Sequence, residues 1–239
     1  MTVGSVQTLE EATELRARSV AFILLAEALG PDGRLLVDPE GIEALRGALR
    51  AGRASAALAR LDGVAPSDLE VEELAGLWVR WFDLGRVAPY EGSNVASNAG
   101  GVTPRLADVA GFYRALGMAV VDERPDHVLA QLEFMAVAVL AEAEAIESGS
   151  TEDEKSTARC ARSFLRDHLG SWIDTWAARV GGVEELSPWF PFAAAAADLV
   201  RAEAARHNVI PLVDDAILPA DAGVADDEEN ELWCDGTGP

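Results

Sequence analysis

The chain has 239 residues, of which 49% are hydrophobic, and its 41 acidic against 19 basic side chains give a net charge of -22 at pH 7. This composition predicts a globular protein with one large domain or two small ones. The charge opposes binding to nucleic acid and to anionic membrane surfaces, and it favours a cationic partner.

Cysteine usage and hydropathy indicate a cytoplasmic protein. Cys160 and Cys234 form no CxxC or CxxH pair, so neither a zinc site nor a disulfide framework is expected. The N-terminus lacks the positive region of a signal peptide. The longest apolar stretch, residues 128–141, is interrupted by Gln131 and Glu133, whereas a spanning helix needs roughly 20 mostly apolar residues. We expect no cofactor and no stable membrane insertion.

Helical periodicity dominates the chain, and runs of alternating β-branched residues are missing, which predicts an all-α fold. We assign residues 1–210 to one helical bundle domain and residues 211–239 to an acidic, mobile tail. The expected helices cover residues 9–29, 40–50, 53–61, 67–82, 106–118, 125–141, 157–180 and 187–207.

Local signals set several expected boundaries. Thr8 with Glu11, and Ser67 with Glu70, are typical of capping boxes at the starts of two helices. Gly170-Ser171 predicts a break within the helical stretch 157–180.

Residues 83–104 form a loop rich in glycine, proline, asparagine and serine, in which we expect no regular structure. Loops of about 20 residues inside compact domains are usually functional or disordered. This one offers four candidate side chains: Pro89, Tyr90, Glu91 and Ser93.

A polar corner, Pro125, Asp126 and His127, directly precedes the most apolar helix. Helix capping explains it in the simplest way, with Pro125 in the first turn and Asp126 favoured by the helix dipole. Two features favour a functional site instead. Asp126 and Glu133 would lie within about 20° of one helix face, and Glu133 is an acid among apolar residues, costly to bury unless it is paired or opens onto a polar site. His127 could also change charge near physiological pH.

Three aromatic residues, Trp78, Trp81 and Phe82, share one side of the expected helix 67–82 at helical spacing. They are expected either to pack in the core or to form a wall for a partner. Aromatic rings beside carboxylates suit an apolar peptide that carries arginines, because arginine stacks on rings and forms bidentate hydrogen bonds with carboxylates.

The segments APYEGS, ERPDHVLAQLEFM and SFLRDHLGSWIDTWAARV, the last followed by a Pro-Trp-Phe helix, resemble the TorD/DmsD/NarJ chaperones of molybdoenzymes. The resemblance runs from the first helix to about residue 207. It implies an all-helical, non-enzymatic cytoplasmic chaperone, monomeric or homodimeric. Such a chaperone binds the apo catalytic subunit of a molybdoenzyme of the DMSO reductase family, often at its twin-arginine signal peptide, assists cofactor insertion and prevents premature export.

Carried onto this chain, the family signature falls on the loop, the corner and Glu133, which would make an acidic, aromatic-edged groove for an arginine-bearing apolar segment. Relatives often continue the loop motif as Tyr-Glu-Ser, whereas this chain has Gly92 before the serine. The full set of candidate client-binding residues is Trp78, Trp81, Phe82, Pro89, Tyr90, Glu91, Ser93, Pro125, Asp126, His127 and Glu133.

Rival functions have weaker support in the sequence. Di-metal carboxylate bundles use Glu-x-x-His pairs, which do not occur here. A hydrolase is not indicated, since Gly-x-Ser-x-Gly and a glycine-rich phosphate loop are both missing. A helical scaffold or regulator that binds an unrelated client remains the alternative, because fold does not fix function.

Overall fold

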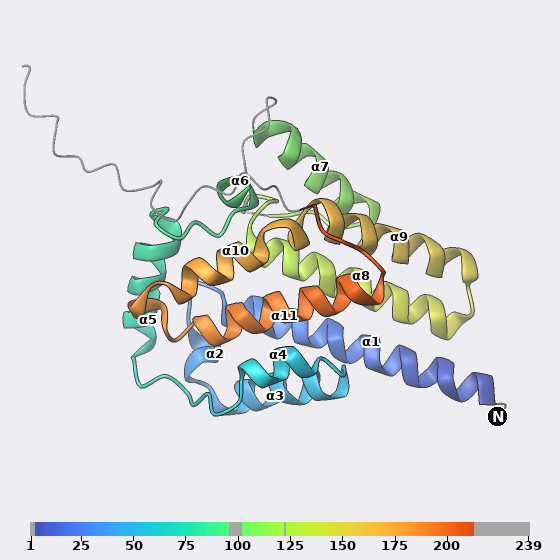
Figure 1. The fold of residues 1–239 in the computed structure, drawn as a ribbon, viewed down its shortest axis with the longest axis horizontal. Helices are drawn as coiled ribbons and strands as arrows, with labels where there is room; N and C mark the ends of the chain where they lie inside the picture. The colour runs from blue at the N-terminus through green and yellow to red at the C-terminus, as the bar shows by residue number, and fades with distance from the viewer. Residues whose placement is uncertain (1–2, 96–101, 122, 213–239) are drawn as a thin grey trace, which may run out of the picture.

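The computed structural model describes residues 3–95, 102–121 and 123–212, and helices dominate these ranges (Figure 1), which confirms the predicted all-α fold class. The tail predicted for residues 211–239 lies, from residue 213 onward, outside the described part. The elements in chain order are α1 (Val3–Ala28), α2 (Arg34–Val37), α3 (Pro39–Ala51), α4 (Ser55–Arg60), α5 (Val71–Trp78), the π-helix η1 (Val79–Asp83), α6 (Glu91–Asn94), α7 (Val102–Ala115), α8 (Val128–Ser148), α9 (Thr151–Asp167), α10 (Leu169–Gly181), the 3₁₀ helix η2 (Glu184–Leu186) and α11 (Phe190–Arg206).

Helix α8 lies inside the bundle, because its apolar residues cover most of its circumference and require partners on several sides. Helix α1 packs along it most extensively, and α9 and α10 also contact it. Helices α10 and α11 pack together, while α3 and α4 cover α1 and α11 from below in Figure 1. Helix α5 crosses one end of the bundle, and α6 and α7 lie along its upper edge.

The core is unusually aromatic around α8 and α10. The ring centroids of Phe134 on α8 and Phe164 on α9 are 4.1 Å apart, so the two helices pack against each other through these side chains. Trp172 and Trp176 of α10 are fully buried, and burial of each large side chain stabilises the fold by about 1.5–3 kcal/mol.

Two predicted capping boxes are wrong. Helix α1 already begins at Val3, so Thr8 and Glu11 lie inside it. At α5 the reciprocal capping box joins Glu70 to Glu73, three residues later than predicted. Ser67 lies before this helix, and its backbone N–H donates to Leu36 O at 2.7 Å, so a tertiary contact fixes it outside α5.

The break near Gly170 occurs two residues early, at His168, whose backbone is far from helical at φ -125 and ψ -105. A Cβ on Gly170 would lie 2.3 Å from the backbone oxygen of Leu165. The glycine therefore permits the close turn between α9 and α10 and does not itself form the break.

The loop expected at 83–104 is shorter than predicted, since α6 forms within it and α7 begins at Val102. Residues 96–101 lie outside the described part. Within the described ranges, none of the helices combines the length and the apolar character needed to cross a membrane.

Candidate functional site

The loop and the polar corner lie against each other, as the groove hypothesis requires. Glu91 N–H donates to Asp126 O at 2.9 Å, and Val128 N–H donates to Pro89 O at 2.8 Å. Between these bonds Tyr90 and His127 form an isolated antiparallel β-bridge. Three consecutive loop residues are thereby fixed to the start of α8.

Asp126 locks the two segments together through its side chain, which is fully buried. Its carboxylate accepts from Gly92 N–H at 3.1 Å and from Arg124 through a two-pronged contact, Nε to Oδ1 at 3.0 Å and Nη2 to Oδ2 at 2.8 Å. A Cβ at Gly92 would lie 3.2 Å from Oδ2 of Asp126, the oxygen that accepts from Gly92 N–H. The glycine that departs from the Tyr-Glu-Ser pattern thus allows the loop backbone to approach Asp126 closely.

Glu91 is the centre of a second, buried network. Its carboxylate accepts from Arg105 at 2.7 Å and from Gln131 at 2.5 Å, and it lies 3.0 Å from His168 Nδ1. Gln131 in turn accepts from Trp172 Nε1 at 3.0 Å. One carboxylate therefore joins α6, α7, α8 and the α9–α10 junction.

His127, and not Pro125, begins the central helix. It is the N-cap of α8, and its Nδ1 accepts from Leu129 N–H at 3.1 Å, which places the ring proton on Nε2. Burial lowers the pKa of His127 and keeps the ring neutral, although the charges of Glu123 and Asp126 act in the opposite direction. Nε2 is buried and has no hydrogen-bond partner within the described residues.

The expected alignment of Asp126 with Glu133 is wrong, because Asp126 precedes α8 and is buried whereas Glu133 is exposed on it. Pro125 also precedes the helix, and its carbonyl accepts from the Tyr113 hydroxyl at 2.6 Å. Glu133 is therefore not a fully buried acid, although partial burial raises its pKa. The buried polar residue in that stretch is Gln131.

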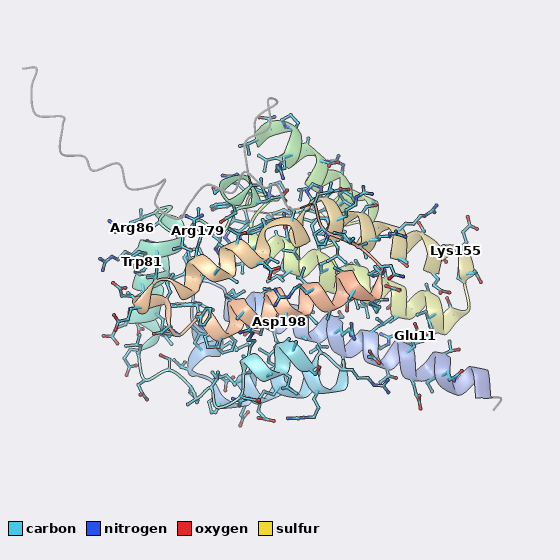
Figure 2. The ribbon with its side chains drawn as sticks, viewed as in Figure 1. Glu11, Trp81, Arg86, Lys155, Arg179 and Asp198 are labelled. Atoms are coloured by element: carbon cyan, nitrogen blue, oxygen red, sulfur yellow. The ribbon has the colours of Figure 1, made fainter. Side chains whose placement is uncertain are left out.

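The three candidate aromatic residues, at the end of α5 and in η1, have two different roles. Phe82 is buried in the core, its ring 5.9 Å from Trp176. Trp78 donates to Leu29 O at 3.0 Å, and its ring is 6.4 Å from His127. Trp81, labelled in Figure 2, lies half-buried against two arginines, with the guanidinium groups of Arg80 and Arg86 each 5.5 Å from its ring centre. Core packing thus accounts for Phe82, while Trp78 and Trp81 lie nearer the surface.

The exposed part of the corner combines aromatic and charged groups. The Arg124 guanidinium lies 4.4 Å above the Tyr90 ring, with 45% of its side chain exposed. Partial burial raises the pKa of the Tyr90 hydroxyl, and the negative charges of Glu123 and Asp83 raise it further. Ser93 is exposed beside this surface.

Of the three candidate acids that the sequence pointed to, only Glu133 is exposed. The side chains of Glu91 and Asp126 are both fully buried and already paired with arginines of the same chain. The two rim acids, Glu123 and Asp83, are both exposed and lie close enough to Tyr90 for their charges to raise the pKa of its hydroxyl. Sequence reasoning missed the partners of these two acids within the chain, which are Arg105, Arg124, Gln131 and His168. Of these, only Arg124 could have been identified from the sequence, because it lies two residues before Asp126 in the ERPDH segment.

The described part of the chain contains no group of three or more histidine, cysteine, aspartate or glutamate side chains arranged to hold a metal ion. Cys160 is a free, half-buried thiol whose pKa is raised by burial. The corner itself offers groups suited to recognition by stacking, charge and hydrogen bonding.

Two comparisons with known proteins indicate the family of this chain. Residues 44–178 match the family described as nitrate reductase delta subunit. The chain is also similar to a selenate reductase assembly chaperone protein from Thauera selenatis, with 29% identity over 149 residues that cover 60% of this chain and 75% of the relative. The family match spans the loop, the corner and both buried networks. The chain therefore belongs to the nitrate reductase delta subunit family, the NarJ/TorD-type chaperones that its motifs resemble, and is an assembly factor, not a catalytic enzyme.

Proposed function

We propose that this protein is a cytoplasmic assembly chaperone that binds the apo catalytic subunit of a molybdoenzyme of the DMSO reductase family. Its membership of the family and the name of the Thauera selenatis relative, which associates that protein with assembly of a reductase, support the assignment. On this proposal the protein holds its client until the cofactor is inserted and prevents premature export.

The observation that carries the proposed site is the rigid attachment of the loop to the start of α8. Three consecutive loop residues are fixed by backbone bonds, and two buried carboxylates hold the surrounding helices. Such a frame presents Tyr90 and Arg124 without the entropic cost of ordering a mobile loop on binding.

The surface chemistry suits a segment that bears arginines, such as a twin-arginine signal peptide. Glu123 and Asp83 offer carboxylates at the rim. The rings of Trp78 and of Tyr90, one face of which Arg124 covers, lie nearby. Arginine can use both kinds of group at once. The net charge of -22 would steer a cationic segment toward the protein from a distance.

A charge-neutralising variant tests this site without disturbing the buried networks. Asp83→Asn/Glu123→Gln removes the two exposed rim charges, and Asp62→Asn/Glu185→Gln removes two exposed charges elsewhere as a matched control. We expect the rim variant to bind the apo catalytic subunit at least about tenfold more weakly, equivalent to about 1.4 kcal/mol, and the control to bind like the wild type.

The same binding assay, repeated with the subunit lacking its signal peptide, separates the two modes of recognition. A rim effect that disappears with the signal peptide would assign this surface to the twin-arginine segment; an effect that persists would assign it to the mature subunit. Equal affinity of the rim variant and its control would refute the proposed site.

A further inference from the structure

A second surface of the molecule carries the opposite charge. Lys155, Arg159 and Arg162 lie on one face of α9, and Arg206 and His207 at the end of α11 close its other side. Together with Thr151, Glu152 and Ala158 they line a cleft of about 720 Å³. Figure 2 shows Lys155 on α9, far from Trp81 at the candidate site.

Lys155, Arg159 and Arg162 stand out because the protein has only 19 basic residues, and most of the others form ion pairs with acidic side chains. Arg206 is bound to Glu142 at 2.7 Å and to Glu203 at 2.8 Å, so its charge is compensated. Lys155, Arg159 and Arg162 are exposed, and within the described part of the chain they form neither hydrogen bonds nor ion pairs. Three positive charges that form no ion pair with a described residue therefore face solvent, beside the one acid of this cleft, Glu152, on a protein whose net charge is -22.

The geometry of the three side chains indicates what they could bind. Positions 155, 159 and 162 follow one another along the helix over about 10 Å. Cations in a row match an extended segment with successive carboxylates better than a single compact anion, which needs donors that converge on one point.

A segment of this composition follows directly in the same chain. Residues 213–239 contain nine acidic and no basic side chains, including Asp226, Asp227, Glu228 and Glu229 in succession. Leu212 N–H donates to Arg166 O at 2.8 Å, so the chain reaches residue 213 one turn of α9 beyond Arg162. The 14 residues that follow Leu212, up to Asp226, can extend up to about 46–50 Å, whereas α9 is about 25 Å long.

We propose that the basic face of α9, formed by Lys155, Arg159 and Arg162, is the docking site for this chain's own acidic segment 213–239. The attachment is intramolecular, so the local concentration of the segment is in the millimolar range and even weak ion pairs keep it bound at low salt. The contact is held by exposed charges and is screened as the Debye length falls to about 3 Å at 1 M salt.

The test uses the full chain and its two cysteines. Cys160→Ser leaves Cys234, inside the acidic segment, as the single site for a fluorescent maleimide label. Fluorescence anisotropy of the label then reports whether the segment moves with the body of the protein. We expect high anisotropy at low salt and a fall toward the value of a labelled free peptide of residues 213–239 at 1 M salt, where the Debye length is about 3 Å.

Charge reversal identifies the docking face. Arg159→Glu/Arg162→Glu should give the low anisotropy at every salt concentration, while Arg50→Glu/Arg114→Glu, which changes the net charge equally at exposed positions elsewhere, should behave like the parent. Neutralising residues 226–229 to Asn and Gln should reproduce the effect of the reversal from the other side.

Two results would overturn the proposal. Anisotropy that is low at all salt concentrations in the parent would mean that the segment does not dock. Anisotropy that stays high in Arg159→Glu/Arg162→Glu would mean that it docks elsewhere. Neither result bears on client binding, so this proposal and the proposed function fail separately.

Discussion

Glu91→Ala should destabilise the protein strongly, because this one carboxylate serves three partners inside the bundle. Removing one side of a buried ion pair costs about 3–5 kcal/mol. The Arg105 side chain is 20% exposed, so water can stabilise part of its charge and reduce that cost. Gln131 and His168 each lose a buried acceptor, which adds about 1–3 kcal/mol for each group left unsatisfied. These contributions share one carboxylate and overlap instead of adding, so we expect a total loss of about 3–5 kcal/mol in the free energy of unfolding.

Guanidinium and thermal denaturation, followed by circular dichroism, measure this loss. A change of that size corresponds to a fall of about 6–20 °C in Tm for a domain of this length. Glu91→Gln keeps the volume and an acceptor and should lose about 1.5–3 kcal/mol. Ser93→Ala, two residues away and exposed, should stay within about 0.5 kcal/mol of the wild type. A loss below about 1 kcal/mol in Glu91→Ala would refute the claim that this network holds the loop to the bundle.

Three further predictions follow from the packing. His127 has a pKa lowered by burial, so the unfolded state binds more protons below pH about 6.5 and stability falls as the pH drops from 7 to 5. His127→Asn, which keeps a helix cap, should make that slope shallower by up to about 1.4 kcal/mol per pH unit; an unchanged slope would contradict a buried neutral ring. Gly170→Ala, whose Cβ would lie 2.3 Å from a backbone oxygen, should lose about 1–3 kcal/mol. Gly47→Ala, in open space on α3, should gain up to about 1 kcal/mol, and equal effects in denaturation would argue against the clash. Phe82→Ala should cost about 3–5 kcal/mol and half-buried Trp81→Ala clearly less; the reverse order would contradict the division of the aromatic residues.

Much of the fold was predictable because helical periodicity is strong, and the break expected between the helices at 40–50 and 53–61 does separate α3 from α4, at Gly52. The capping errors have a physical reason. Ser67-x-x-Glu70 and Glu70-x-x-Glu73 are overlapping capping patterns, and the bond from Ser67 N–H to Leu36 O, distant in sequence, holds Ser67 outside the helix. Local sequence cannot contain that information.

The contact between the loop and the polar corner was predictable, whereas the charges exposed on this surface were not. The segments around Tyr90 and Asp126 do meet, as the resemblance implied. Which acids remain accessible depends on Arg105, which reaches Glu91 from α7, and on Arg124, which folds back onto Asp126. Pairing of this kind depends on tertiary geometry, and the buried Gln131 and the exposed Glu133 are distinguished only by the rotation of α8 within the bundle.

The most direct test of the proposed function is a tagged pull-down from the native host, with co-purified proteins identified by mass spectrometry. Wild-type protein, the rim variant Asp83→Asn/Glu123→Gln and the control Asp62→Asn/Glu185→Gln would be compared at equal expression. We expect the catalytic subunit of a molybdoenzyme to be enriched with the wild type and the control and depleted with the rim variant. Recovery of unrelated proteins alone, in all three samples, would contradict the assignment as a molybdoenzyme chaperone.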